Sequence, residues 1–263
     1  MSTYDKYSDF ILTDPRISRP TQYSGYNVNP EFMQGRHDAF FHNYDLKDKR
    51  ILDIGCCVGA LGAYALDHGA KFYCGVEYNK ILSDIAISNF SRSFPNNLWE
   101  IKNISVEDFS KSNNEKYDIL ILSGVIYALF DPIPVLIALH KMADSIIVES
   151  MQPTILELFP VELKQIIIRN AKWSSFLENS SFIQYGDTPM MSGYPGGSAV
   201  VNGCAPSLGF IKHFLNLLGF KNTNIVNDLL KDKFPDVYNT TGRYGERFEK
   251  YTDSRKALGY VEI

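Results

Sequence analysis

The chain has 263 residues, a formal net charge of -4 and a charged fraction of 21%. This length predicts one sizeable domain, with or without a lid, and the acidic balance argues against a dedicated nucleic-acid binder, which usually shows a basic footprint. No apolar run approaches the roughly 18 residues of a membrane span, and the charged N-terminus MSTYDKYSDF lacks the apolar stretch of a signal peptide. The cysteines form no CxxC and pair with no histidine at zinc-like spacing, so we expect reduced thiols, no metal site and a cytoplasmic protein.

The first 150 residues change character near residue 46. Residues 1–45 are rich in Tyr, Pro and Asn and are interpreted as a lead-in segment or lid with one helix over Glu31–His42. In residues 46–150, apolar runs predict five strands: KRILDIG, KFYCGVE, LWEIKNI, YDILILSG and DSIIVES. The segments between them predict helices over Ala60–Gly69, Lys80–Phe94 and Ile133–Met142. This alternation predicts an α/β, doubly wound, Rossmann-like core with a parallel sheet covered on both faces.

After residue 150 the alternation ends. Residues 151–205 are interpreted as a substrate lid: an amphipathic helix over Pro160–Asn170 and then an irregular segment, QYGDTPMMSGYPGGSAVVNG, of a length typical of binding loops. Residues 206–263 are expected to complete the core with a helix in APSLGFIKHFLNLLGF, a strand in KNTNIVN and a last strand in KALGYVEI. These strands would form a C-terminal antiparallel hairpin and give a seven-stranded mixed sheet.

The turn after the first strand carries the pattern acid-x-G-x-x-x-G, formed by Asp53, Gly55 and Gly59. In a doubly wound sheet this turn approaches the ligand most closely, and glycines let the backbone come near it. Gly62 follows, but the spacing of the dinucleotide fingerprint is not met. Because an acid would repel a pyrophosphate, Asp53 suits a ligand with an ammonium group and a sulfonium.

Two further segments extend this nucleoside-binding pattern. Glu77 ends the second strand, where a carboxylate can accept hydrogen bonds from both ribose hydroxyls, and Tyr78 follows it. The segment SVEDF follows the third strand, where an adenine is commonly bracketed. It contributes Ser105, Val106 and Glu107 as candidate cofactor contacts.

The glycine turn, the ribose acid and the adenine segment together resemble the class I S-adenosylmethionine-dependent methyltransferases. The resemblance implies S-adenosyl-L-methionine as cofactor and S-adenosyl-L-homocysteine as product. It also implies cofactor contacts from Cys57, which stands where the family usually has glycine, and from Ser123 and Tyr127 near the end of the fourth strand. The alternative is a Rossmann-like domain that binds another nucleotide or none.

Several stretches are also similar to the tRNA wobble-uridine carboxymethyltransferases and their relatives: SGYNVNPEF, SGVIYALFDPIPVLIAL, APSLGFIKHFLNLLGF and DSRKALGYVEI. In that group, cations and a Tyr-His pair hold the carboxylate of carboxy-S-adenosylmethionine. The chain keeps Tyr127, and Arg255 aligns with an arginine of the group, but Ala128 replaces the histidine and the lead-in lysine is absent, although Arg19 is nearby. Because a carboxylate in a low-dielectric site needs paired donors, ordinary S-adenosylmethionine is favoured.

Methyl transfer to a hydroxyl requires a positioned base. The candidates are His37 on the lead-in helix, Tyr127 beside the expected methyl group, and Glu149 at the end of the fifth strand. Alternative interpretations stay open for two of them: a surface histidine for His37 and a structural carboxylate for Glu149.

The acceptor is expected to contact Tyr185, Asp187 and Tyr194 of the insertion and Arg255 of the locally basic tail. Aromatic faces and polar groups on a loop suit a polar ring, so the predicted function is O-methylation of a small polar metabolite such as a sugar or nucleotide sugar. The alternatives are modification of a tRNA wobble uridine and a non-catalytic partner protein with the same fold. The sequence leaves the acceptor atom, the base and the oligomeric state open.

Overall fold

The structure of the protein is a computed structural model. It describes residues 37–38, 40–41, 44–126, 129, 131–151, 182–188, 201–206, 208–220, 224–227 and 258–262. Residues 37, 38 and 40 are helical, but most of the helix predicted over Glu31–His42 lies outside the described residues, as does all of the helix predicted over Pro160–Asn170.

Five parallel strands form the centre of the sheet. They are β1 (Arg50–Ile54), β2 (Phe72–Val76), β3 (Trp99–Lys102), β4 (Tyr117–Ser123) and β5 (Ala143–Met151). Their order is β3-β2-β1-β4-β5, and every neighbouring pair is parallel. The predicted α/β fold with a parallel sheet is therefore confirmed for these strands. The strand order reverses between β1 and β4, which is where doubly wound sheets bind their ligands.

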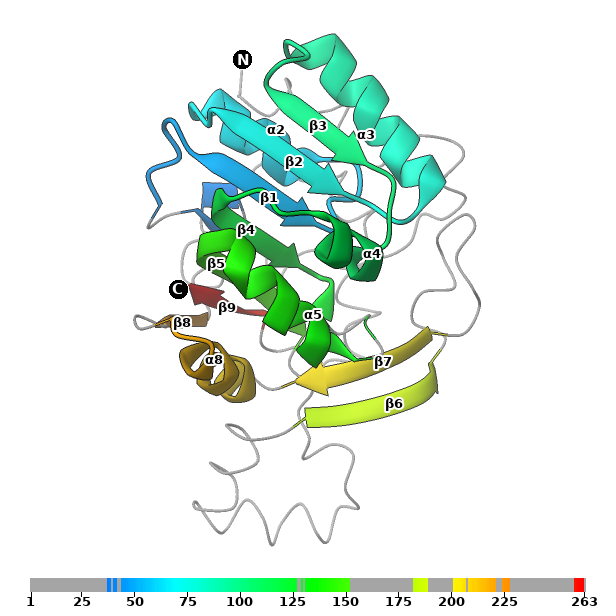
Figure 1. Ribbon diagram of the computed structural model, residues 1–263, viewed down its shortest axis with the longest axis vertical. Coiled ribbons are helices and arrows are strands. Elements are labelled where there is room, and N and C mark those ends of the chain that lie inside the picture. Colours follow the sequence, from blue (N-terminus) through cyan, green and yellow to red (C-terminus); the bar gives the residue numbers. More distant parts are fainter. Residues whose placement is uncertain are drawn as a thin grey trace, which may run out of the picture.

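Further strands follow in the C-terminal half. β9 (Leu258–Glu262) pairs antiparallel with β5, and β8 (Asn224–Asn227) pairs antiparallel with β9 at the edge of the sheet (Figure 1). β6 (Phe182–Thr188) and β7 (Val201–Pro206) form a separate two-stranded antiparallel sheet. The prediction of an irregular segment is wrong for these two strands. The prediction followed the Gly and Pro residues of the segment, whereas the aromatic and β-branched residues of β6 (FIQYGDT) favour extended backbone, and β7 (VNGCAP) pairs with it.

Helices cover both faces of the sheet. α4 (Val106–Ser112), α5 (Pro132–Leu139) and α8 (Leu208–Leu217) pack on one face against strand residues such as Leu52 and Leu122, and Figure 1 shows α5 in front of the strands with α4 and α8 to either side of it. α2 (Ala60–Asp67) and α3 (Lys80–Ser93) pack on the other face against Ile51, Ile121 and Ile147. The helices predicted between the strands are confirmed as α2, α3 and α5. No helix among the described residues is long and apolar enough to cross a membrane.

Short polar side chains set the first turns of three helices. The side chains of Asn79, Ser105 and Asp131 accept backbone N–H groups at the starts of α3, α4 and α5, which satisfies donors that the helix itself leaves open. The helix α4 was not predicted, because SVEDF was interpreted as a ligand loop. The structure makes this segment the cap and first turn of a seven-residue helix.

Candidate functional site

The turn between β1 and α2 is tied to the end of β2. The backbone N–H groups of Gly55 and Cys56 both donate to the Val76 carbonyl oxygen, at 2.8 and 3.1 Å. The turn contains three positive φ angles, at Gly55 (72°), Cys57 (54°) and Gly59 (88°). The turn thus survives with cysteine at the central position, although a side chain in this region of backbone conformation costs about 1–2 kcal/mol.

The structure shows a packing role for the two glycines of the turn. A Cβ atom at Gly55 would lie 2.3 Å from Cγ2 of Val125, and a Cβ atom at Gly59 would lie 2.2 Å from the ring of Phe90. Neither position can therefore take a side chain without moving its neighbours, whatever binds above the turn.

Glu77 joins this turn to the end of β2. Its carboxylate is buried and accepts hydrogen bonds from the backbone N–H of Cys57 (Oε2, 3.0 Å) and of Asn79 (Oε1, 2.7 Å). Burial raises the pKa of Glu77, and the two N–H donors act in the opposite direction. Each carboxylate oxygen has two lone pairs, so each can accept a further hydrogen bond from a ligand.

One contributor to this region was missed by the sequence analysis. The Nδ2 atom of Asn103, directly after β3, donates to the carbonyl oxygens of Glu77 (2.8 Å) and Tyr78 (2.9 Å). Asn103 therefore fixes the backbone that carries Glu77, while the side chain of Tyr78 is 77% exposed beside it. A polar residue directly after a predicted strand was the available signal.

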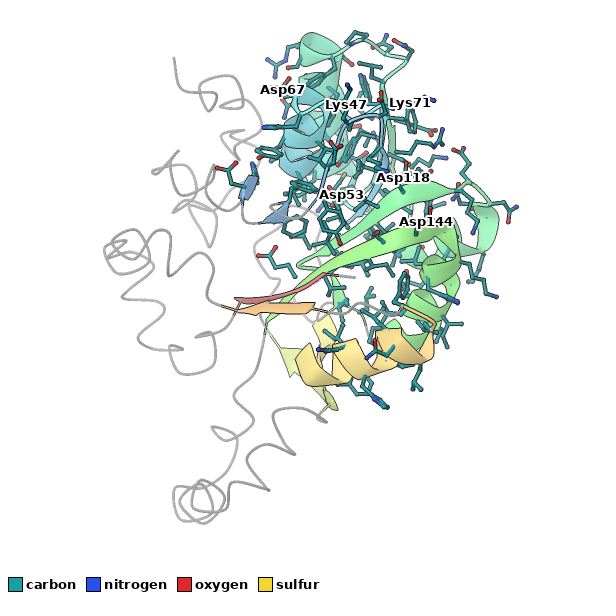
Figure 2. All side chains as sticks on the ribbon, turned by 90° about the vertical axis from the view of Figure 1, so that its left-hand side faces the viewer. Lys47, Asp53, Asp67, Lys71, Asp118 and Asp144 are labelled. Carbon is teal, nitrogen blue, oxygen red and sulfur yellow. The ribbon has the colours of Figure 1, made fainter. Side chains whose placement is uncertain are left out.

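Asp53 lies below the turn and is buried. Its Oδ2 atom accepts a hydrogen bond of 2.9 Å from the hydroxyl of Tyr73. Figure 2 labels Asp53 together with three residues of the amino-terminal edge: Lys71 directly precedes β2, and Asp118 and Asp144 are the second residues of β4 and β5. The charged groups at that amino-terminal edge form exposed pairs such as Lys49–Asp118. The buried acids, Asp53 and Glu77, lie instead toward the carboxyl ends of β1 and β2.

Glu149 and Ser123 lie side by side near the carboxyl ends of β5 and β4, where they are register partners. The Ser123 hydroxyl donates to Oε2 of Glu149, and the N–H of Gly124 donates to the Glu149 carbonyl oxygen at 3.0 Å. Glu149 is buried. In the alternation along their strands, Glu149 and Asp53 share the face of Ile147 and Ile51, so this face of the sheet holds acids from β1 and β5.

The remaining predicted residues fall into two groups. His37 is fully buried with its ring edge-on to Tyr64 of α2, at 5.4 Å between centroids, so the interpretation as a surface histidine is wrong. Two residues of the predicted adenine segment differ in burial: Val106 is buried in the core, and Glu107 is exposed. Five predicted residues have no described side chain. Tyr127, Tyr194 and Arg255 lie outside the described residues, and the side chains of Tyr185 and Asp187 on β6 lie outside them as well.

Comparison with protein-family models finds no match. Among curated proteins, 67 residues are 37% identical to protein arginine N-methyltransferase 1 of Saccharomyces cerevisiae, a match that spans 23% of this chain and only 19% of that protein.

Similar solved structures cover far more of the chain. A protein of Listeria monocytogenes assigned to the S-adenosylmethionine-dependent methyltransferases has a TM-score of 0.57 at 16% identity, over 88% of this chain and 96% of the other. The N-terminal domain of EvdMO1, crystallised in the presence of S-adenosylhomocysteine and D-fucose, has a TM-score of 0.54 at 16% identity, over 74% of this chain and 76% of the other. Likeness at these identities establishes the fold.

Proposed function

We infer that this chain, which has the fold of the class I S-adenosylmethionine-dependent methyltransferases, binds S-adenosylmethionine at the carboxyl ends of β1 and β2 and transfers its methyl group. The observation that carries this proposal is Glu77, a buried carboxylate that is held by two backbone N–H groups beside the glycine turn. The 67-residue match to an arginine methyltransferase and the S-adenosylhomocysteine in the EvdMO1 crystals support it.

The residues at this edge fit the proposed cofactor. Glu77 has lone pairs for the two ribose hydroxyls, and the exposed ring of Tyr78 follows it in the chain. The carboxylate of Asp53 favours a ligand with a positive end, because a pyrophosphate at the same place would be repelled. Cys57, Gly55, Gly59, Ser105, Val106, Glu107 and Ser123 remain proposed contacts.

The acceptor is proposed to be a hydroxyl of a small polar molecule such as a sugar. The cofactor supplies an electrophilic methyl group on its sulfonium. Glu149 then takes the proton that leaves the hydroxyl, and Ser123 holds the carboxylate through its hydrogen bond. D-fucose in the EvdMO1 crystals supports a sugar. His37 and Tyr127 stay candidates for the base.

The insertion is proposed to enclose this acceptor. Tyr185, Asp187 and Tyr194 would contact the polar ring, and Arg255 would contact an anionic group such as the phosphate of a nucleotide sugar. The strands β8 and β9 are proposed to complete the seven-stranded sheet on which the insertion rests.

Two measurements test the proposal. Calorimetric titration should give micromolar affinity for S-adenosylmethionine, and mass spectrometry of molecules released from the denatured protein should identify the same compound or its product. Absence of binding would refute the cofactor. Release of the carboxylated cofactor would replace the sugar by a tRNA wobble uridine as the leading acceptor.

The base is tested with a panel of sugars and nucleotide sugars. Glu149→Gln should lower kcat by roughly 10²–10⁴-fold and leave cofactor affinity within about threefold. Glu100→Gln on β3, an exposed acid, is the matched control. An unchanged kcat in Glu149→Gln would show that Glu149 is a structural carboxylate.

A further inference from the structure

We propose that Tyr73 is a positioning residue that holds Asp53 for the positively charged end of the cofactor, and that Gly62 and Gly75 are needed to admit its ring. The proposal rests on the proposed function, because it takes S-adenosylmethionine as the ligand that meets Asp53.

The geometry places the tyrosine hydroxyl under the turn. Tyr73 is fully buried on β2, and its hydroxyl donates to Oδ2 of Asp53 at 2.9 Å. In the parallel register the neighbour of Asp53 is Gly75, whereas Tyr73 is paired with Ile51, two residues earlier. The ring must therefore extend along the sheet past Gly75 to reach the carboxylate.

Two glycines provide the room for this path. A Cβ atom at Gly62 of α2 would lie 2.2–2.4 Å from the ring atoms Cζ, Cε2 and Cε1 of Tyr73. A Cβ atom at Gly75 would lie 3.1 Å from the tyrosine hydroxyl and 2.7 Å from Sγ of Cys56. Neither glycine has a positive φ, so space and not backbone conformation is the reason for them.

The ring is also held from its face. Phe90 of α3 stacks on Tyr73 with 5.1 Å between ring centroids and 3° between planes. Contacts from α2, α3 and β2 thus leave the hydroxyl little freedom, and the direction of its hydrogen bond is determined by packing.

A tyrosine suits this task for an electrostatic reason. A buried carboxylate requires hydrogen-bond donors, but an arginine or lysine would cancel the charge that a cationic ligand needs. The neutral hydroxyl satisfies Oδ2 and leaves the negative charge of Asp53 in place. Burial and the nearby Asp53 also raise the pKa of Tyr73, so the hydroxyl stays a donor at every assay pH.

The test uses two ligands with the same adenosine group. S-adenosylmethionine carries the sulfonium and ammonium groups, whereas 5′-methylthioadenosine is neutral. Tyr73→Phe should weaken S-adenosylmethionine about tenfold, because a hydrogen bond to a charged group is lost, and should change 5′-methylthioadenosine less than threefold. In an Asp53→Asn background, Tyr73→Phe should change S-adenosylmethionine affinity less than threefold.

The controls separate positioning from general damage. Tyr117→Phe removes the hydroxyl of another buried tyrosine, in the core on the α4–α5–α8 side, and should leave both affinities unchanged. Gly62→Ala should weaken S-adenosylmethionine as Tyr73→Phe does.

Equal weakening of both ligands in Tyr73→Phe, or an undiminished effect in Asp53→Asn, would overturn the proposal while the proposed function stands. If the wild type binds neither nucleoside, the proposed function fails and the cofactor role of Tyr73 fails with it. The link to Asp53 is then decided by urea unfolding: Tyr73→Phe should lower the free energy of unfolding more in the wild-type background than in the Asp53→Asn background, because a hydrogen bond to a charged group is stronger than one to an amide oxygen.

Discussion

Glu77→Gln tests the cofactor site most directly, because the change keeps the size of the side chain and alters its hydrogen bonding. The carboxylate accepts one N–H on each oxygen, from Cys57 and Asn79. An amide has one acceptor oxygen, so its NH₂ group would face one of these donors, and one ribose hydroxyl would lose its acceptor. A hydrogen bond to a charged group contributes about 1.5–3 kcal/mol, which corresponds to a loss of affinity of roughly 10- to 150-fold.

The assay is calorimetric titration with S-adenosylmethionine and S-adenosylhomocysteine. Both carry the same ribose, so both should weaken by the same factor. Glu100→Gln is the control, since this acid of β3 has a side chain 48% exposed and pairs with Lys102 at 3.3 Å. A loss below threefold, or one confined to S-adenosylmethionine, would refute the reasoning that Glu77 acts through the ribose.

The raised pKa of Glu77 adds a pH dependence with a definite sign. Burial makes the folded, ligand-free protein bind this proton more readily than the unfolded chain does. The contribution of Glu77 to stability therefore becomes less favourable as pH rises through its folded-state pKa. Cofactor affinity should change in the opposite direction: it should fall on acidification, beginning at a higher pH than for an ordinary glutamate, and Glu77→Gln should flatten this limb.

Three further substitutions test the frame of the site. Cys57→Gly relieves a left-handed side chain and should raise the free energy of unfolding by up to about 1 kcal/mol; lower stability in urea denaturation would show that thiol packing outweighs strain. Gly59→Ala would place Cβ 2.2 Å from the Phe90 ring at a positive φ and should cost at least about 3 kcal/mol; an unchanged Tm would contradict this. Asn103→Ala removes two hydrogen bonds to the backbone around Glu77 and should weaken S-adenosylmethionine about fivefold at modest cost in Tm; unchanged affinity would show that the loop is held without it.

The five central strands could be predicted from the sequence because buried parallel strands are continuous apolar runs, and such a run is visible within a few neighbouring residues. The prediction failed where composition is ambiguous. The segment that forms α4 is only seven residues long, and its Ser and acids suit a loop as well as a capped helix. The strands β6 and β7 were missed because they flank a Gly- and Pro-rich segment, and the composition of that segment determined the prediction for the whole insertion.

The candidate site also contains residues that the sequence could predict and contacts that it could not. Asp53, Gly55 and Glu77 were predicted because their spacing follows one strand, one turn and the end of the next strand. Contacts between strands, such as Tyr73 with Asp53, depend on register and on the helix packed above, and neither can be derived from spacing.

The distribution of buried charge has a consequence for how the protein can diverge. Among the described residues, the buried carboxylate and imidazole side chains are His37, Asp53, Glu77 and Glu149, while the core under α4, α5 and α8 contains apolar residues and one tyrosine. Volume-conserving apolar exchanges in such a core usually cost less than about 1.5 kcal/mol, so that side of the sheet can drift freely through evolution. Homologues should therefore differ widely in the core residues beneath α5 and remain alike beneath α2. A mutant library built for a new acceptor should vary the core beneath α5 to gain stability and the residues on the α2 side of the sheet to change the chemistry.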